Sequence, residues 1–354
     1  MADSLSADGV STTRRRPTLR MVAERAGVST ATVSYVFSGR DGVSGAGVAP
    51  DTIRRVREAA EQLNYRPNRS ARAMRTGRTE TVQLALHMLS DPWALAVADA
   101  VNAEAKQHDL TTLILADGDW HAALDRIECD VAYLDQAPDT EPGRRHLADL
   151  VERGQRLVVF SETLEPNGFD VIRSEALPGC ELAMDHLLER HVEIGCLAAE
   201  SMLATDDRSR YSVYQEKMAA HGLTVDPSWV QSYTTTHASA FEAAVALLSS
   251  PRRPTAVYAT TDFAAIAVIN AAHMLGLRVP HDLAVTGVGN TPHAASVAPT
   301  LTTVGPTDFY VRQAKVIVDR ALADDTDPTR LHEFPWSLFP GGSTDLDAPG
   351  ATRL

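Results

Sequence analysis

Arginine side chains are concentrated at the start of this 354-residue chain. Residues 1–79 contain 14 arginines, no lysine and 7 acidic residues, which gives a net charge of +7. The remaining 275 residues contain 19 basic and 39 acidic residues, so they carry −20 and the whole chain −13. The guanidinium group donates paired hydrogen bonds that fit phosphate oxygens. The charge distribution therefore predicts a polyanionic partner for the first segment only.

Hydroxyl side chains in the same segment are expected on the outer face of a short helix. Apolar residues recur at positions 19, 22, 23 and 26, the spacing of a helix that Thr18 can cap and Gly27 can end. A second helix, capped by Ser29, buries positions 33, 36 and 37 and presents Thr30, Ala31, Thr32, Ser34 and Tyr35. Two short helices joined by a tight glycine turn are typical of a helix-turn-helix, although any helical hairpin would show the same pattern.

Two further helices are predicted before the composition changes. Apolar positions 53, 56, 60 and 63 indicate a third helix, with Pro50 in its first turn. Asn68 can then cap a helix of about two turns that ends at Gly77. So short a helix is marginal in water, because nucleation costs more than its few hydrogen bonds return. We expect it to form fully only when a partner holds it.

These residues resemble the N-terminal domain and hinge of the LacI/GalR family of bacterial transcriptional repressors. The resemblance is carried by Val22-Ala23, Ala26-Gly27-Val28-Ser29, Thr32-Val33-Ser34, residues 63–68, and Ala71-Arg72 through Thr79. It implies that Thr30 and Ala31 read base edges and that paired hinge helices enter the minor groove, with Met74 as the wedge. Tyr35 stands where the family commonly has arginine. The alternative for Met74 is packing against the body of the protein.

The predicted DNA-binding residues come from the second helix, its flanks and the hinge. Arg40, in a glycine-rich loop over residues 39–47, and Arg14 to Arg16 can reach phosphates, but solvated arginines would look the same. The full set is Thr18, Ser29, Thr30, Ala31, Thr32, Ser34, Tyr35, Arg40, Asn68, Arg69, Ala71, Arg72, Met74 and Arg75.

From residue 81 onward, buried strands alternate with helices. Strands are predicted at 82–86, 112–115, 131–134, 157–160, 194–197, 256–259 and 283–287. This alternation predicts two parallel, doubly wound sheets that form two lobes with a cleft between them. Residues 254–256, 261–265, 276–287, 299–304 and 342–344 resemble the family's effector-binding body, which is similar to periplasmic sugar-binding proteins.

The resemblance places Arg210 and Asp262 where the family holds a small effector. A guanidinium donates and a carboxylate accepts hydrogen bonds, which suits a polyhydroxylated ligand, and Trp93 can supply an aromatic face for its ring. The alternatives are an interlobe salt bridge between Arg210 and Asp262, and core packing for Trp93. The predicted effector-binding residues are thus Trp93, Arg210 and Asp262.

The expected fold is an all-α helix-turn-helix DNA-binding head plus an α/β two-lobed periplasmic-binding-protein-like body. We expect a disordered tail over 1–17, the helix-turn-helix domain over 18–66 and the hinge helix and linker over 67–79. The effector-binding and dimerisation domain then covers 80–344, and 345–354 is a flexible tail.

Catalysis and metal binding are not expected. No GxGxxG follows a predicted strand, and the chain has no P-loop and no HExxH motif. The three cysteines, Cys129, Cys180 and Cys196, lack paired spacing and suit reduced thiols in a cytoplasm. No apolar run is as long as a membrane span, and the first residues lack the apolar core of a signal peptide, so we expect a cytoplasmic, nucleoid-associated protein.

The sequence therefore predicts a sequence-specific transcriptional regulator, a repressor that binds a pseudo-palindromic double-stranded DNA operator as a homodimer. A small-molecule effector would set its operator affinity, and no cofactor, metal or membrane is involved. The alternative is a ligand-binding protein of the same fold whose DNA binding is weakened or lost.

Overall fold

The computed structural model describes residues 17–37, 48–87, 91–116, 120–205, 208–234, 236–324 and 327–345, and of residues 69, 70 and 75 only the backbone. The chain forms two compact units, Met1–Arg78 and Thr79–Leu354. The predictions for the first 16 residues, for Arg40 and its loop, and for the tail after residue 345 lie outside the described residues.

The first unit contains the helices that the sequence predicted. They are α1 (Leu19–Ala26), α2 (Thr30–Phe37), α3 (Pro50–Leu63) and α4 (Arg69–Thr76). The first three enclose a small core that includes the buried side chains of Val22, Val33 and Val56. The predicted caps are also confirmed: the Thr18 hydroxyl accepts a hydrogen bond from the Met21 amide, and the left-handed Gly27 ends α1.

Helix α4 is closed at both ends by local hydrogen bonds. The Asn68 Oδ1 atom accepts from the amide of Ala71 at 3.3 Å, and the amide of Gly77 donates to the carbonyl of Ala73 at 2.7 Å. Gly77 has φ +69°, a left-handed conformation that favours glycine at a helix end. The helix and its caps are confirmed, while its dependence on a partner that holds it stays a prediction.

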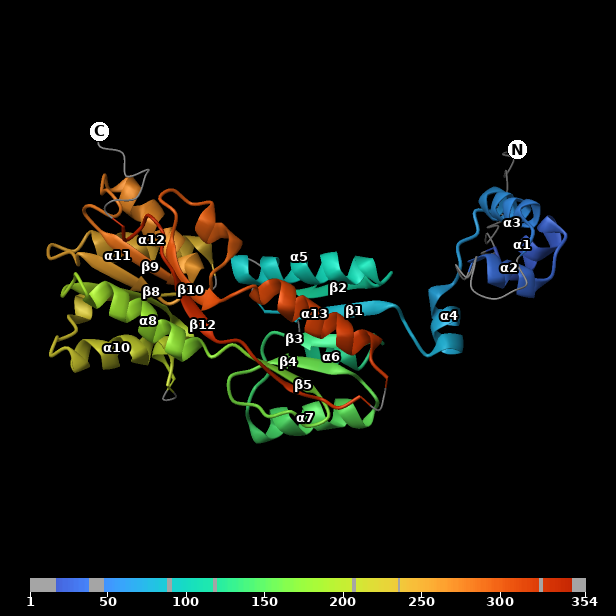
Figure 1. Cartoon of the computed structure of the whole chain (residues 1–354), viewed down its shortest axis with the longest axis horizontal. Helices are drawn as coiled ribbons and strands as arrows, with labels where there is room; N and C mark the ends of the chain where they lie inside the picture. Colours follow the sequence, from blue (N-terminus) through green and yellow to red (C-terminus); the bar gives the residue numbers. More distant parts are fainter. Residues whose placement is uncertain are drawn as a thin grey trace, which may run out of the picture. The chain divides into compact units, whose positions relative to one another are not determined.

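One six-stranded parallel sheet forms the first lobe of the second unit, here called lobe 1. Its strand order is β11-β5-β4-β3-β1-β2. Figure 1 shows α5 and α13 together on one face and α7 on the other, with α6 on the α7 side. The elements are β1 (Thr81–Leu86), α5 (Pro92–Gln107), β2 (Thr111–Ala116), α6 (Trp120–Leu124), β3 (Val131–Leu134), α7 (Glu141–Glu152), β4 (Leu157–Phe160), β5 (Asp170–Arg173), α13 (Phe309–Leu322) and β11 (Leu331–Glu333).

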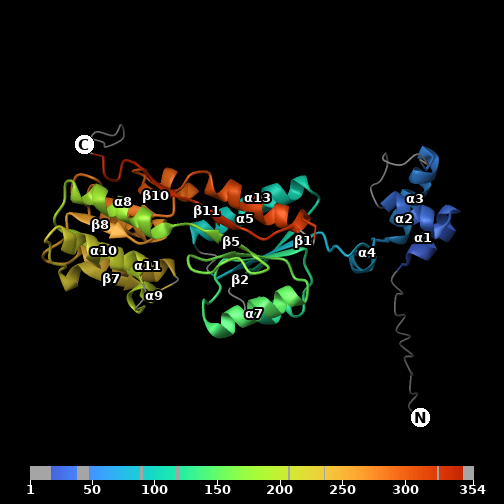
Figure 2. The same ribbon diagram turned by 60° about the horizontal axis from the view of Figure 1, so that its bottom comes forward.

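A second six-stranded sheet, in the order β12-β10-β9-β8-β6-β7, forms lobe 2. Helices α8 and α10 cover one face and α11 and α12 the other (Figure 1). Figure 2 shows the same lobe from a different side. The elements are α8 (Ala176–Leu188), β6 (Ile194–Ala199), α9 (Glu200–Leu203), α10 (Arg210–Ala220), η1 (Pro227–Trp229), β7 (Val230–Tyr233), α11 (His237–Leu248), β8 (Ala256–Ala259), α12 (Asp262–Met274), β9 (Ala284–Val288), η2 (Pro292–Ala295), β10 (Thr302–Pro306) and β12 (Trp336–Phe339).

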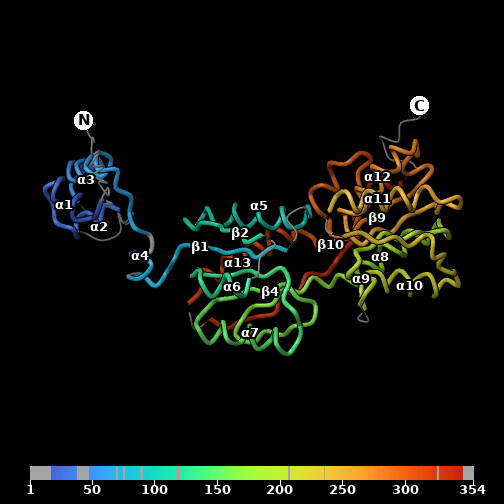
Figure 3. Tube along the Cα trace, turned by 180° about the vertical axis from the view of Figure 1, so that it is seen from behind, coloured from blue at the N-terminus to red at the C-terminus, as the bar shows by residue number. Residues whose placement is uncertain are grey.

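The chain crosses between the lobes after β5, after β10 and after β11. The red and orange segments of Figure 3 show how α13 returns to lobe 1 late in the sequence. The two predicted parallel sheets are confirmed, with one exception at the last crossing, where β12 pairs antiparallel with β10. The other strands of lobe 2 run toward the cleft, whereas β12 enters the lobe from the cleft and must run away from it.

A buried carboxylate ties the late elements of lobe 1 to β5. The Asp170 side chain is only 2% exposed, and it accepts hydrogen bonds from Arg320 of α13, the amide of Arg330 and His332 of β11. Burial raises the pKa of Asp170, but the hydrogen bonds from His332, Arg320 and Arg330 outweigh burial and hold it below its usual value. The ionised carboxylate therefore helps to hold α13 and β11 in place.

We expect Arg320→Met to lower the free energy of unfolding by about 3 kcal/mol, because it leaves a buried carboxylate without its main cation. Lys315→Met on the same helix removes an exposed pair with Asp319 and should cost less than about 0.5 kcal/mol. Urea unfolding of the full chain measures both. Equal losses in the two variants would contradict this role for Asp170.

Candidate DNA-binding and effector sites

The start of α2 exposes hydroxyl-bearing side chains because the apolar stripe of this helix faces inward. Val33 and Val36 are buried in the core of the first unit, so Ser29, Thr30 and Ala31 are left exposed at the helix start. The Ser29 Oγ atom accepts from the amide of Thr32 at 3.1 Å and lies 2.9 Å from the Thr32 hydroxyl. The helix start is thus fixed by its cap, while the hydroxyl of Thr30 and the methyl of Ala31 face outward.

A groove of about 1070 Å³ in the first unit collects half of the predicted DNA-binding residues. It runs from the start of α1 and α2 to the segment between α3 and α4. The predicted residues that line it are Thr18, Thr30, Ala31, Ser34, Asn68, Ala71 and Arg72. Ser29, Thr32, Tyr35 and Met74 do not line it, and the side chains of residues 69 and 75 are not described.

Sequence reasoning missed the groove residues that connect α3 to α4. Asn64 ends α3 in a left-handed conformation, and the ring of Tyr65 packs 5.9 Å from that of Phe37 in α2. Arg66 and Pro67 follow in the groove wall. The signal was the run Asn64 to Asn68 itself, which marks a helix end followed by an extended segment.

Among the described residues of the first unit, Met74 is the most exposed large apolar side chain, at 89%. None of the described residues of this unit covers it. Its insertion between base pairs stays a prediction.

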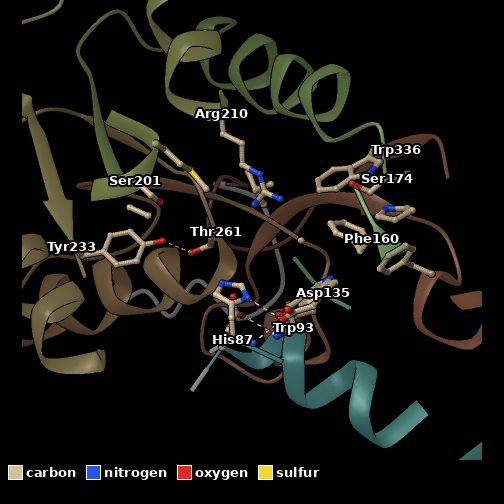
Figure 4. A pocket seen from close by; sticks show the side chains of 18 of the residues that line it. His87, Trp93, Asp135, Phe160, Ser174, Ser201, Arg210, Tyr233, Thr261 and Trp336 are labelled. Atoms are coloured by element: carbon tan, nitrogen blue, oxygen red, sulfur yellow. Dashed lines mark hydrogen bonds and ion pairs between the residues drawn. The ribbon is translucent and has the colours of Figure 1, made fainter. Parts of the chain in front are cut away.

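A cavity of about 450 Å³ lies between the two lobes of the second unit. Its walls come from the carboxyl ends of parallel strands, as expected for doubly wound sheets. Figure 4 shows Arg210 and Tyr233 reaching in from lobe 2, and Trp93, Phe160 and the His87–Asp135 pair facing them. The lining residues of lobe 1 are His87, Asp91, Trp93, Asp135, Phe160, Ser174 and Phe309, and those of lobe 2 are Ala199, Glu200, Ser201, Met202, Arg210, Tyr233, Thr234, Thr261, Val288, Gly289, Thr291, Pro306 and Trp336.

Arg210 and Trp93 both lie in the cavity wall, where the sequence placed an effector site. Arg210 is the first residue of α10; its Nη1 atom donates to the carbonyl of Thr260 at 2.9 Å, and its guanidinium carbon lies 5.8 Å from the Trp336 ring. Trp93 packs on Phe160 with ring centroids 5.3 Å apart. Their contact with an effector stays a prediction.

Asp262 does not line the cavity, unlike the other two predicted residues. Its side chain is 1% exposed; Oδ2 accepts from the amide and hydroxyl of Thr291 at 2.7 and 2.9 Å, and Oδ1 accepts from the Thr303 hydroxyl. Burial raises its pKa to about 6 against the hydrogen bonds from Thr303 and Thr291. The carboxylate therefore supports Thr291 and the wall of the cavity from behind.

The alternative of an interlobe salt bridge between Arg210 and Asp262 is wrong. Both residues belong to lobe 2, and no ion pair joins them among the described residues. Arg210 instead donates to a carbonyl, and Asp262 is occupied by threonines. Space behind the cavity is tight, since a Cβ atom at Gly287 would lie 2.5 Å from the Asp262 Oδ1 atom.

Several polar residues of the cavity were not predicted. The Asp135 Oδ2 atom accepts from the backbone amide of His87 and lies 2.9 Å from its ring nitrogen Nδ1. Asp91 caps α5 by accepting from the amide of Trp93, and burial raises the pKa of its carboxyl. The signal for His87 and Asp135 was their place directly after predicted strands. No signal was available for Trp336, because its strand was not predicted.

In the described part of the chain, no helix combines the length and the apolar composition of a membrane-spanning segment. The same residues contain no group of three or more histidine, cysteine, aspartate or glutamate side chains arranged to hold a metal ion.

Comparison with known proteins supports both units. Residues 18–68 match the family described as bacterial regulatory proteins, lacI family, and residues 184–344 match the periplasmic binding protein-like domain. The transcriptional regulator CelR of Thermobifida fusca is 30% identical over 338 residues, which cover 90% of this chain and 96% of CelR. The transcriptional repressor PurR of Proteus mirabilis is 31% identical over 336 residues, 90% of this chain and 94% of PurR.

Solved structures agree on the fold. A CelR–cellobiose complex is 26% identical, covers 93% of this chain and 100% of that one, and has a TM-score of 0.58. A lac repressor dimer bound to operator is 21% identical, covers 93% and 99% of the two chains and has a TM-score of 0.71, which shows a shared fold. The relatives are regulators rather than enzymes. This chain therefore belongs to the lacI family of bacterial regulatory proteins and is a helix-turn-helix, DNA-binding transcriptional regulator with an effector-binding body.

Proposed function

We propose that this protein is a repressor that binds a pseudo-palindromic operator as a homodimer and responds to a small polyhydroxylated molecule. The observation that carries the proposal is the cavity that both lobes line, in a chain whose first unit exposes the start of a helix-turn-helix recognition helix. A ligand there contacts both lobes and therefore favours one of their relative positions. Four features of the chain would take part: a helix that reads bases, a hinge side chain that acts as a wedge, a dimer face and an effector site.

Base reading is assigned to α2 and phosphate contact to the arginines. The exposed Thr30 and Ala31 offer a hydroxyl and a methyl group, which suit a base edge and a thymine methyl. Thr18, Ser29, Thr32, Ser34 and Tyr35 flank them, and the hinge adds Asn68, Arg69, Ala71, Arg72, Met74 and Arg75. Salt-dependent affinity follows from the +7 charge of residues 1–79.

A second copy of the chain is assigned to the edge of the lobe 1 sheet. Strand β2 is an edge strand, and Leu113 and Ile114 are 41% and 49% exposed on its two faces. An apolar edge strand is usually covered, since it can pair with another chain. A two-fold dimer through this edge also accounts for a pseudo-palindromic operator.

The start of β1 connects the hinge to lobe 1. The Asp130 carboxylate accepts from the amide of Thr79 at 2.6 Å, from the Thr79 hydroxyl at 3.0 Å and from the amide of Glu80 at 3.0 Å. Residues 79 and 80 therefore follow lobe 1 when a ligand changes its position relative to lobe 2. Helix α4 ends three residues earlier, at Thr76, so this anchor supplies the route from effector to hinge.

The chemistry of the cavity suits a hydroxylated ring. Arg210 donates, Asp91 accepts, and the aromatic faces of Trp93, Phe160 and Trp336 stack on apolar ring surfaces. That a related regulator was solved with cellobiose supports this class of ligand.

The alternative function is a ligand-binding protein without DNA binding. It is favoured by Tyr35, which stands where the family commonly has arginine. If the protein chemically converted a bound ligand, that result would support an enzymatic function instead.

Operator selection from a random duplex pool tests the proposal directly. We expect the purified protein to enrich a pseudo-palindrome bound by two chains, because a two-fold dimer presents two heads. Affinity for the winner should fall steeply with salt, by about 0.9 logarithmic units per neutralised phosphate and per decade of salt. A folded protein that enriches no sequence, with or without sugars, would support the alternative without DNA binding.

Met74→Ala should weaken operator binding by about tenfold and reduce the bend of the operator. Insertion of the side chain unstacks a base step, and the bent DNA then makes new contacts with the protein that offset the cost of unstacking. Stability should not change, because Met74 is exposed. Gel-shift affinity and bend-dependent energy transfer on a labelled duplex measure the two effects. Met274→Ala, an exposed methionine of α12, is the matched control and should leave both unchanged. If the unsubstituted protein leaves the operator unbent, the role of Met74 as a wedge is refuted.

Arg210→Gln should lower effector affinity by about tenfold to a hundredfold, since it removes a charge-assisted donor worth about 1.5–3 kcal/mol. Lys217→Gln on the same helix, where Lys217 pairs with Asp185 at the surface, should leave affinity unchanged. Calorimetry with a panel of neutral and aminated mono- and disaccharides identifies the ligand and compares the variants. Equal affinities in the two variants would move the effector site away from Arg210.

A further inference from the structure

The ionisable side chains of the cavity are mostly acidic. Three carboxylates line it, those of Asp91, Asp135 and Glu200, against one guanidinium, that of Arg210. His87 also lines it and lies against Asp135. No described residue of the wall is a lysine, and the body segments that lie between described ranges contain no lysine, arginine or histidine in their sequence. A phosphate or carboxylate ligand would meet one cation and three anions.

Two of the helix N-termini near the cavity carry carboxylates of the chain. Asp91 caps α5, where its Oδ1 atom accepts from the amide of Trp93 at 2.9 Å. Asp262 is the first residue of α12 and lies behind the wall. The positive ends of helices usually attract an anionic ligand group. Here the protein itself supplies that negative charge at both helices.

Aromatic rings complete a surface that favours a cation. Trp93, Phe160, Phe309, Tyr233 and Trp336 all line the cavity. Figure 4 shows that Arg210 points toward Trp336, whereas Trp93 lies beside the His87–Asp135 pair on the opposite wall. The negative faces of aromatic rings, together with carboxylates, are the chemistry that proteins use to bind ammonium groups. Because Arg210 lies near Trp336, we assign binding of an ammonium group to the wall of lobe 1.

Asp91 is the carboxylate best placed to meet an ammonium group. Asp135 already accepts two hydrogen bonds from His87, and Glu200 is exposed at the rim. Asp91 accepts only the amide of Trp93 among its hydrogen bonds in the described structure. Burial raises the pKa of its carboxyl although the Trp93 amide and the charges of Arg210 and His87 lower it, so the charged form is only partly compensated inside the protein. A ligand cation beside it would restore that compensation.

We propose that the effector is an amine-bearing hydroxylated ring, an amino sugar, whose ammonium group binds Asp91 while ring oxygens accept hydrogen bonds from Arg210. The proposal rests on the proposed function only in taking the interlobe cavity as the effector site. Asp91 is then the residue that distinguishes a positively charged amino sugar from a neutral sugar. Lobe 1 then supplies the charge recognition and lobe 2 the donor to the ring, so an amino sugar binds both lobes at once.

Matched ligands test the charge requirement on the purified full chain. Calorimetry compares glucose, galactose and cellobiose with glucosamine, galactosamine and the glucosamine dimer, and adds N-acetylglucosamine and glucose 6-phosphate. We expect at least one amino sugar to bind at least about tenfold more tightly than its parent and its acetylated form. Parent sugars that bind as tightly as the amines, an acetylated or phosphorylated sugar that binds best, or an absence of amine binding would overturn the proposal.

Two variants separate the charge of Asp91 from the general acidity of the second unit. Asp91→Asn keeps the helix cap, because asparagine caps as well as aspartate, and removes the charge. It should lower the affinity for the amino sugar at least about tenfold more than the affinity for the parent sugar, because the asparagine oxygen still accepts from a hydroxyl group but carries no charge. Asp99→Asn on the same helix removes an exposed charge outside the cavity and should change neither affinity by more than about twofold. Equal effects of the two substitutions would overturn the role of Asp91.

Operator binding is measured separately, so the two proposals can fail independently. An amino sugar that binds without changing operator affinity would refute the regulatory coupling and leave the ligand assignment intact. A chain that binds operator but prefers neutral sugars would refute the amino-sugar assignment and leave the proposed regulation intact.

Discussion

The direction of the strands in both sheets determines where this protein can hold a ligand. Every strand that runs from the outer end of a lobe finishes at the cleft, so the side chains that follow these strands converge there. His87, Asp135, Tyr233 and Gly289 come from four different strands and still line one cavity. The antiparallel β12 obeys the same constraint from the opposite direction, since its first residue, Trp336, is the one at the cleft.

The cavity wall in lobe 2 depends on a buried group that never reaches the cavity. Asp262 holds Thr291 by two hydrogen bonds and Thr303 by a third, which positions the loop after β9. This position has an electrostatic cost, because burial disfavours the charged carboxylate and raises the pKa of Asp262 to about 6. The resemblance gave this aspartate a direct contact with the effector, whereas the structure gives it a supporting position.

Charge is divided between the units in a way that matches their partners. The arginine-rich first unit suits phosphates, and the acidic second unit repels them, which confines DNA contact to the first. The same acidity extends into the effector cavity, where only Arg210 among the described lining residues carries a permanent positive charge. The composition that keeps the body away from DNA thus also favours a neutral or cationic effector over an anionic one.

The sequence by itself determined the helices of the first unit and seven of the strands, because their apolar periodicity and their caps are local properties. It did not reveal β5, β7, β10, β11 and β12, because their residues do not form a continuous apolar run and these strands gain their stability from neighbouring strands. It also placed Arg210 and Trp93 at the cavity but could not separate Asp262 from it. Which side chain faces a cavity and which supports it from behind depends on how α12 packs against β9 and β10. Only the tertiary structure decided that, since the contacts join residues about 30 to 40 positions apart.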